Sequence, residues 1–202
     1  MAYIFEYIRS LVGKDYFTRK LHDNEAGIFY DLGSGTGKVI LSMALFCPFK
    51  KLVGIEALRG LWDLSMRSRF HYYKHISNKF MKFNDLFSIE RTNEIDFYNG
   101  DFMRQRWTDA AIVFANSTCF SDHLMDKIGI KAMFECKVEC ILVTISKKLK
   151  NLNEDWECFD EFKRNMSWGL ASIFIYIRRK VTVNKYLAYI KHLFLCLINS
   201  YF

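Results

Sequence analysis

The sequence predicts an α/β fold built on a doubly wound, mostly parallel β-sheet. Short apolar segments that are typical of buried strands alternate along the chain with longer helical patterns. The first of these strands runs directly into a glycine-rich turn, and a later one is almost wholly apolar, as a central buried strand should be. At 202 residues the chain can bury one sizeable core, and no repeat or Gly/Ser/Pro linker divides it. We therefore expect one sheet, with ligands bound at the carboxyl ends of its strands.

Each element follows from its own pattern. Pro48 ends the first helix, and Ser121 followed by Asp122 is a typical start for the last one. The stretch after residue 145 is acidic and predicts a loop. The predicted strands cover residues 28–32, 52–56, 95–98, 111–115, 138–145 and 172–179, and the predicted helices cover residues 38–46, 58–76 and 121–131. The whole chain divides into a helical N-terminal segment over residues 1–27, the sheet domain over residues 28–180 and an apolar tail over residues 181–202.

Charge and composition limit the class of protein. The formal net charge is +7, from 29 Lys and Arg against 22 Asp and Glu, which favours a polyanionic partner without requiring one. Basic residues gather in the segment 59–82, where contact with nucleic acid competes with an ordinary solvated helix face. Acidic residues gather just before Met166, where they could attract a basic protein segment. Six cysteines occur without the spacing of a zinc site, so we predict no metal.

The two ends of the chain bear on its location. No signal peptide is expected, because Glu6 and Arg9 interrupt the only apolar stretch at the start, and this predicts a nuclear or cytoplasmic protein. The tail from residue 186 to residue 202 is apolar but short for a membrane span and contains Lys191. We favour an amphipathic helix docked on the domain, or an extension, over a membrane anchor. The sequence does not give the oligomeric state.

The turn Asp31-Leu-Gly-Ser-Gly-Thr-Gly37 closes the first strand and opens a helix, where free N–H groups favour an anion. Three cofactors compete for such a turn. A nucleoside-triphosphate loop would require Gly-Lys-Ser or Gly-Lys-Thr, but Val39 follows Gly37-Lys38. A dinucleotide fingerprint would require glycine where Lys38 or Ile40 stands. The spacing that is present, D-x-G-x-G-x-G, resembles the first motif of methyltransferases that bind S-adenosylmethionine, in which the aspartate and the glycine turn receive the methionine part.

Two more acidic residues end the next two strands. Glu56 follows the second strand, where an acidic residue can accept hydrogen bonds from both ribose hydroxyls. Asp101 follows the third strand and could accept from the adenine amino group, while Phe102 beside it offers a stacking face. One such carboxylate would be as consistent with a cap as with a ligand. Three at consecutive strand ends favour a cofactor site.

Four motifs in order resemble the disruptor-of-telomeric-silencing (Dot1-like) family of non-SET histone-lysine methyltransferases. They are DLGSGTGK, GDF, the run Asn116-Ser-Thr-Cys-Phe120, and Met166-Ser-Trp168-Gly, and the resemblance spans residues 29–179, closest to short protist-type members. It implies a seven-stranded, Rossmann-like class I fold, the cofactor S-adenosylmethionine, and a protein substrate such as a histone or a nucleosome. It also implies that Asn116 lies beside the methyl group and that Phe120 and Trp168 wall the substrate channel. The cofactor-binding residues are then Asp31, Gly33, Ser34, Gly35, Gly37, Glu56, Asp101, Phe102 and Asn116.

The sequence also departs from that family. Chromatin enzymes have Asn-Asn-Phe-Ala-Phe where this chain has Asn116-Ser-Thr-Cys-Phe120, and the Tyr-Gly-Glu lid expected before the first strand is absent between residues 1 and 28. The first departure bears on the lysine pocket more than on the cofactor. The second leaves three alternatives: an N-terminal helix that replaces the lid, a shortened chain, or an inactive relative kept as a binding module. Other methyl acceptors, namely a non-histone protein, RNA or a small amine, also remain open. In the active case, Asn116 would orient the amine, and Phe120, Trp168 and Tyr176 would desolvate it.

Overall fold

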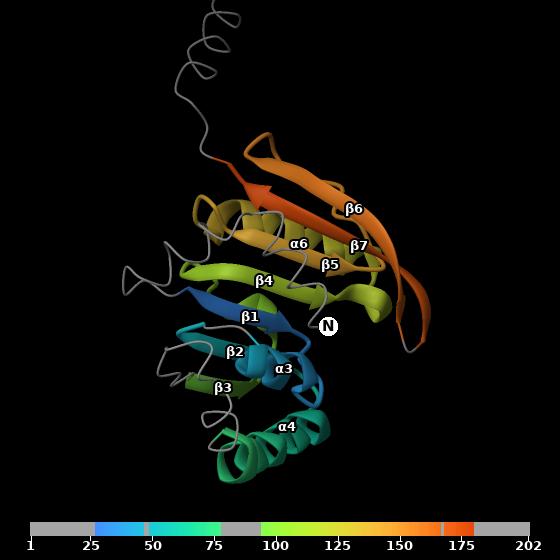
Figure 1. Ribbon diagram of the computed structural model, residues 1–202. Coiled ribbons are helices and arrows are strands. Elements are labelled where there is room, and N and C mark those ends of the chain that lie inside the picture. The colour runs from blue at the N-terminus through green and yellow to red at the C-terminus, as the bar shows by residue number, and fades with distance from the viewer. Residues whose placement is uncertain (1–26, 47–48, 78–93, 167, 180–202) are drawn as a thin grey trace, which may run out of the picture.

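The computed structural model describes residues 27–46, 49–77, 94–166 and 168–179. Their strands form one seven-stranded sheet in the order β3-β2-β1-β4-β5-β7-β6 (Figure 1). The strands are β1 (Ile28–Leu32), β2 (Lys51–Glu56), β3 (Glu94–Asn99), β4 (Ala110–Asn116), β5 (Ile141–Ile145), β6 (Trp156–Met166) and β7 (Gly169–Arg178). The first five are parallel, and β7 is antiparallel to both of its neighbours. This confirms the predicted doubly wound, mostly parallel sheet.

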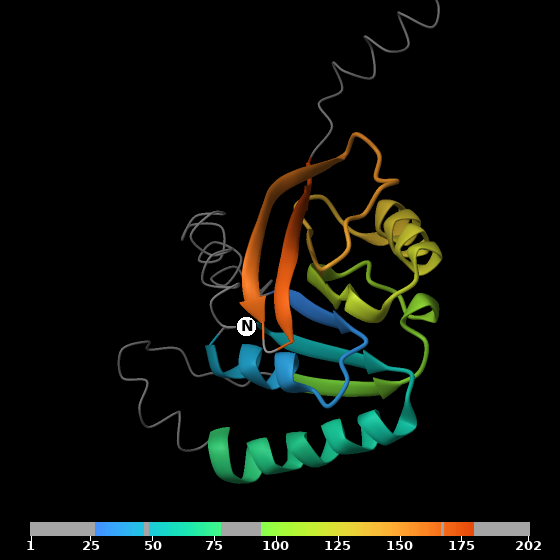
Figure 2. The same ribbon diagram turned by 90° about the vertical axis from the view of Figure 1, so that its right-hand side faces the viewer.

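Helices cover both faces of the sheet, α3 and α4 on one and α6 on the other (Figure 2). Alternate residues of each strand point to opposite faces, so that Phe29 packs with the α3 side and Tyr30 with the α6 side. The two resulting apolar layers contain most of the buried side chains. The helices are α3 (Lys38–Phe46), α4 (Arg59–His71) and α6 (Asp122–Glu135), with a π-helical turn η1 (Tyr72–Ser77) and 3-10 turns η2 (Phe102–Arg104) and η3 (Ser117–Cys119).

Most predicted elements are confirmed, with two corrections. The predicted strand over residues 138–145 begins only at Ile141, because Glu139 is left-handed (φ 67°) and Cys140 N–H closes a turn on Lys137 O. The predicted acidic loop is wrong from Trp156 onward, where the chain forms the eleven-residue strand β6. Since β6 pairs only with β7 among the described strands, it lies at a sheet edge, and an edge strand carries charged side chains readily.

The structure tests some of the remaining sequence predictions and not others. Ser121 caps α6 as expected, accepting from Leu124 N–H at 3.2 Å. The N-terminal helical segment up to residue 26, the apolar tail and residues 78–82 of the basic segment lie outside the described residues. Of the helices in the described part, none is long and apolar enough to cross a membrane.

Candidate cofactor and methyl-acceptor site

The carboxyl ends of four parallel strands lie side by side, and the predicted site residues lie at or just after these ends. Here "this edge" means this row of carboxyl ends. Leu32 at the end of β1 pairs with Ile55 on one side and with Ala115 on the other. Asn116 at the end of β4 pairs with Ile145 at the end of β5. Because all four strands are parallel, the segments that follow them emerge side by side. The register therefore brings together the glycine turn, Glu56 and Asn116.

The glycine turn is fixed by backbone hydrogen bonds and by close packing. Gly33 N–H and Ser34 N–H both donate to Ile55 O, at 2.9 and 3.0 Å. Gly37 has φ 81°, and a Cβ there would lie 2.5 Å from Phe97 Cζ. Both the left-handed backbone and the phenylalanine exclude a side chain at this position. The turn thus has one conformation, with the start of α3 directly behind it.

Two carboxylates are buried beneath this turn. Glu56 is satisfied within the protein: its Oε2 accepts from Gly35 N–H at 2.9 Å and its Oε1 from Leu58 N–H at 2.8 Å. Asp31 is only 2% exposed, and its Oδ2 has no hydrogen-bond partner among the described residues; the buried Ser34 Oγ has none either. Burial, and then the nearby Glu56, raise the pKa of Asp31 to about 8. A buried acceptor without a donor costs free energy, so Asp31 favours a ligand that brings a donor or a positive charge.

The third predicted acidic residue has a structural role in this state. Asp101 Oδ1 accepts from Met103 N–H at 2.8 Å and so caps the turn η2, while its side chain remains half-exposed. Phe102 beside it is buried, and its ring stacks on that of Phe120 with centroids 5.6 Å apart. The contact of Asp101 with adenine remains a prediction. The stacking of Phe102 on adenine also remains a prediction, since its ring faces Phe120 in this structure.

Of the predicted acceptor residues, Phe120 contacts the glycine turn, and Asn116 lies at the end of β4. A Cβ built on Gly33 would lie 3.2 Å from Phe120 Cζ, so the phenylalanine ring covers the turn. Asn116 is half-buried at the end of β4, and its Oδ1 accepts from Thr118 Oγ1 at 2.9 Å. One edge of the sheet therefore carries a buried unpaired carboxylate, a tight glycine turn and an amide beside aromatic rings.

Trp168 lies at the tip of the β6–β7 hairpin, which extends past this same edge (Figure 1). Its position follows from β7, which runs antiparallel to β5 and pairs Ile173 with Ile145. The indole is 53% exposed, and its role as a channel wall remains a prediction. The prediction that Tyr176 lines the channel is wrong. Tyr176 lies in mid-strand opposite Leu142 and is 2% exposed, its OH accepts from Leu149 N–H at 2.9 Å, and burial raises its pKa to about 12.

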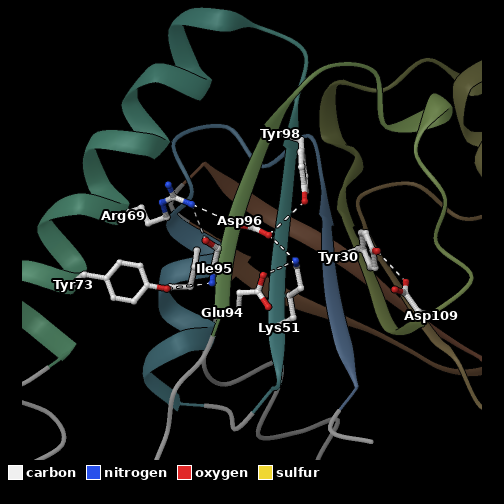
Figure 3. Close-up of polar contacts among 9 residues, drawn as sticks. All are labelled: Tyr30, Lys51, Arg69, Tyr73, Glu94, Ile95, Asp96, Tyr98 and Asp109. Carbon is white, nitrogen blue, oxygen red and sulfur yellow. Dashed lines mark hydrogen bonds and ion pairs between the residues drawn. The ribbon is translucent and has the colours of Figure 1, made fainter.

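The predicted basic surface over residues 59–82 is only partly available. Arg69 Nη1 donates to Ile95 O at 2.9 Å and lies 3.6 Å from Asp96 Oδ1 (Figure 3). Asp96 also pairs with Lys51 Nζ at 2.6 Å, within a polar cluster that ties α4 to the edge strand β3. Arg69 thus has a structural partner. Other cations of this segment, Arg59, Arg67 and Lys74, are exposed.

Three hydroxyl residues near Asn116, which were not among the predicted site residues, contribute to this site: Ser117, Thr118 and Ser146. Thr118 Oγ1 lies 2.8 Å from Ser146 Oγ, which follows β5. Ser117, between Asn116 and Thr118, is fully buried and donates to Ile145 O at 2.5 Å, which locks the ends of β4 and β5 together. The one signal in the sequence was the position of the Ser-Lys-Lys run directly after an apolar strand. As for metals, no group of three or more potential ligands occurs in the part of the chain that the structure describes.

The seven-stranded, mostly parallel sheet with a glycine turn at its strand ends is the fold of the Rossmann-like methyltransferases. The model of the family "Histone methylation protein DOT1" matches residues 13–168, and the chain belongs to this family. The chain is 28% identical, over 127 residues, to the H3 lysine-79 specific histone-lysine N-methyltransferase of Caenorhabditis elegans. That match covers 63% of this chain and 13% of the relative, so the chain spans only a small part of that protein's length.

Solved structures share the fold. An RNA methyltransferase from Salinibacter ruber, in complex with S-adenosyl-L-homocysteine, has a TM-score of 0.53 and 14% identity, over 84% of this chain and 94% of that one. A putative methyltransferase from Escherichia coli has a TM-score of 0.56 and 16% identity, over 83% and 85% of the two chains. At these identities the likeness concerns the fold alone. The predicted fold class and family are confirmed.

Proposed function

We propose that this protein transfers a methyl group from S-adenosylmethionine to a lysine side chain of a protein, with a histone as the leading substrate. The observation that supports this most strongly is the meeting, at one sheet edge, of the unpaired buried carboxylate of Asp31, the glycine turn, and Asn116 with Phe120. The family membership and the relative with H3 lysine-79 specificity support the choice of substrate.

The residues present fit this cofactor. The orphaned acceptor Asp31 suits the ammonium of a methionine moiety, and N–H groups at the start of α3 suit its carboxylate. Glu56 would receive the ribose at the end of β2, while Asp101 and Phe102 would flank the adenine. Bound S-adenosylmethionine supplies an electrophilic methyl group on a positively charged sulfur. Ser34, whose buried hydroxyl lacks a partner, is a further ligand candidate at the methionine end.

The protein's own task is to present a neutral, oriented amine. A free lysine has a pKa of about 10.4, so most of its amine is protonated at neutral pH. Aromatic walls formed by Phe120 and Trp168 would disfavour the ammonium and lower this pKa. One lone pair of Asn116 Oδ1 is used by Thr118, and the second is free to accept from the amine. Catalysis would then rest on positioning and exclusion of water.

A histone substrate would place the protein in the nucleus, and contact with nucleosomal DNA would fall to exposed basic residues such as Arg67 and Lys74. These residues lie on the helical segment beside β3, while the acceptor residues follow β4 and β5. A substrate that used both surfaces would therefore have to span the width of the sheet. Nucleosomes are large enough to do so, and a short peptide is not.

The test is transfer of labelled methyl to nucleosomes, free histones, total RNA and a protein extract. Asn116→Ala serves as the site variant, and Thr108→Val, exposed at the opposite end of β4, serves as the matched control. Label on a histone lysine that is lost in Asn116→Ala and kept in Thr108→Val would support the proposal. Label only on RNA or on another protein would show that the methyl acceptor is not a histone. No label despite bound cofactor would indicate a binding module.

A further inference from the structure

We propose that Thr118 and Ser146 are positioning residues that hold the Asn116 amide in one orientation through a chain of two hydroxyls. This rests on the proposed function, because Asn116 is taken to face the reacting amine. The distances are 2.8 Å from Ser146 Oγ to Thr118 Oγ1 and 2.9 Å from Thr118 Oγ1 to Asn116 Oδ1.

The direction of both hydrogen bonds follows from the number of protons. A threonine hydroxyl has a single proton, and Thr118 donates it to Asn116 Oδ1. Ser146 must therefore donate to Thr118 Oγ1, which leaves both bonds pointing toward the amide. Among the described residues, no group accepts from Asn116 Nδ2. Thr118 thus fixes the position of the amide oxygen, and the second lone pair of that oxygen remains available to the reacting amine.

The fold brings the two hydroxyls together from distant parts of the chain. β4 and β5 end side by side, with Asn116 paired to Ile145, and Ser117 bonds across to Ile145 O. Thr118 and Ser146 are the next residues on each side. Ser146 is left-handed with φ 76°, a conformation that serine adopts only at a cost, and its N–H donates to Ser172 O at 2.7 Å. The backbone of β7 therefore holds Ser146 where its hydroxyl reaches Thr118.

A purely structural role explains these contacts less well. Thr118 is exposed and Ser146 and Asn116 are half-buried, so their hydrogen bonds compete with water and contribute little to folding. The orientation of the Asn116 amide, by contrast, affects which group faces the substrate. If the amide rotated by half a turn, it would exchange an acceptor for a donor at the position of the amine. The relay prevents that exchange and leaves the second lone pair of Oδ1 fixed.

The variants separate the hydroxyl from the shape of the side chain. Thr118→Val keeps the shape and removes the hydroxyl, and Thr118→Ser keeps the hydroxyl. Ser146→Gly removes the second hydroxyl and suits the left-handed backbone, so it should fold at least as well. Thr108→Val is the matched control. We expect Thr118→Val and Ser146→Gly to lower kcat about tenfold with KM for both substrates, cofactor affinity and melting temperature unchanged, and Thr118→Ser to restore most of the rate.

A second measurement does not depend on activity. The side-chain amide proton pair of Asn116, identified by its absence from the NMR spectrum of Asn116→Asp, should move toward the position of a solvated asparagine in Thr118→Val. It should stay in place in Thr118→Ser. Unchanged kcat in Thr118→Val, or equal loss in Thr118→Ser, would overturn the relay. If the wild-type protein labels no histone, the proposed function fails, and the relay is then judged from the Asn116 amide signal of the cofactor-bound protein. A signal that does not move in Thr118→Val overturns the relay, and one that moves supports it.

Discussion

Replacing Asp31 with asparagine should stabilise the ligand-free protein at high pH and at the same time weaken cofactor binding. The carboxyl group of Asp31 has its ordinary pKa of 3.8 in the unfolded chain and a pKa of about 8 in the folded one, raised by burial and by Glu56. Below about pH 4 the group is protonated in both states and does not affect stability. As the pH rises toward 8, the unfolded chain ionises freely and the folded chain does not, so stability is lost across this range.

The size of this loss can be estimated. The pKa of Asp31 is 3.8 in the unfolded chain and about 8 in the folded one, a difference of about 4 pH units. Each pH unit corresponds to about 1.4 kcal/mol, so the loss of folding free energy is at most about 6 kcal/mol. Local relaxation and entry of water reduce the cost of a buried charge, so we expect a loss of about 2 kcal/mol between pH 5 and pH 8.5. For a chain of this size, that corresponds to about 4–8 °C in melting temperature.

The assay is thermal unfolding of the wild type and Asp31→Asn from pH 5 to pH 8.5, beside the exposed control Asp63→Asn. The difference between wild type and Asp31→Asn should grow with pH, while Asp63→Asn follows the wild type. Calorimetry at pH 8 should show that Asp31→Asn binds S-adenosylmethionine at least about tenfold more weakly, since a charge-assisted bond is lost. Parallel pH profiles for wild type and Asp31→Asn would refute the reasoning about the buried carboxylate.

Three further changes test other parts of the site. Glu56→Ala removes the acceptor of Gly35 N–H, and calorimetry should show at least tenfold weaker cofactor binding; undiminished affinity would argue against a role for this carboxylate. Gly37→Ala, with its left-handed backbone and close approach to Phe97, should lower the free energy of unfolding by about 2–4 kcal/mol in urea titrations, whereas the control Gly60→Ala, with open space around it in α4, should not destabilise. Trp168→Ala should leave the melting temperature within about 2 °C, because the indole is mostly exposed, and should reduce methyl transfer; full activity would remove Trp168 from the channel.

The fold was largely predictable because its strands are short, apolar and bounded by clear signals. The segment Ile28–Leu32 ends at a glycine turn, and Ser121 caps its helix, so both boundaries are local in origin. Strand β6 was not predictable in the same way. From Glu161 to Met166 exposed and half-buried residues alternate because β7 lies beside β6, and that pairing is a property of the whole sheet.

The site likewise has a part that the sequence predicts and a part that it does not. The positions of Asp31, Glu56 and Asn116 could be predicted because each lies at or next to the carboxyl end of a strand, and parallel strands bring these ends together. The hydrogen-bond partners of these residues could not be predicted from the sequence. Glu56 satisfies two backbone N–H groups, and Thr118 meets Ser146 across two strands, which depends on register to within one residue. The sequence does not show that Tyr176 lies in the core, because the register of β7 on β5 decides this.

The site lies at the carboxyl ends of β1, β2, β4 and β5, and this has a consequence for how the protein folds. The β1-α3-β2 unit carries the glycine turn and Glu56, but Asn116 follows β4, which pairs with β1 although β2 and β3 lie between them in the chain. Such non-local pairing is slow to form, and partly folded species would lack any high-affinity form of the pocket. Ligand would therefore bind only the completed domain and would shift the whole folding equilibrium by mass action. Protection of backbone amides from hydrogen exchange should then rise across the entire sheet when cofactor is added, including strand β3 at the far edge.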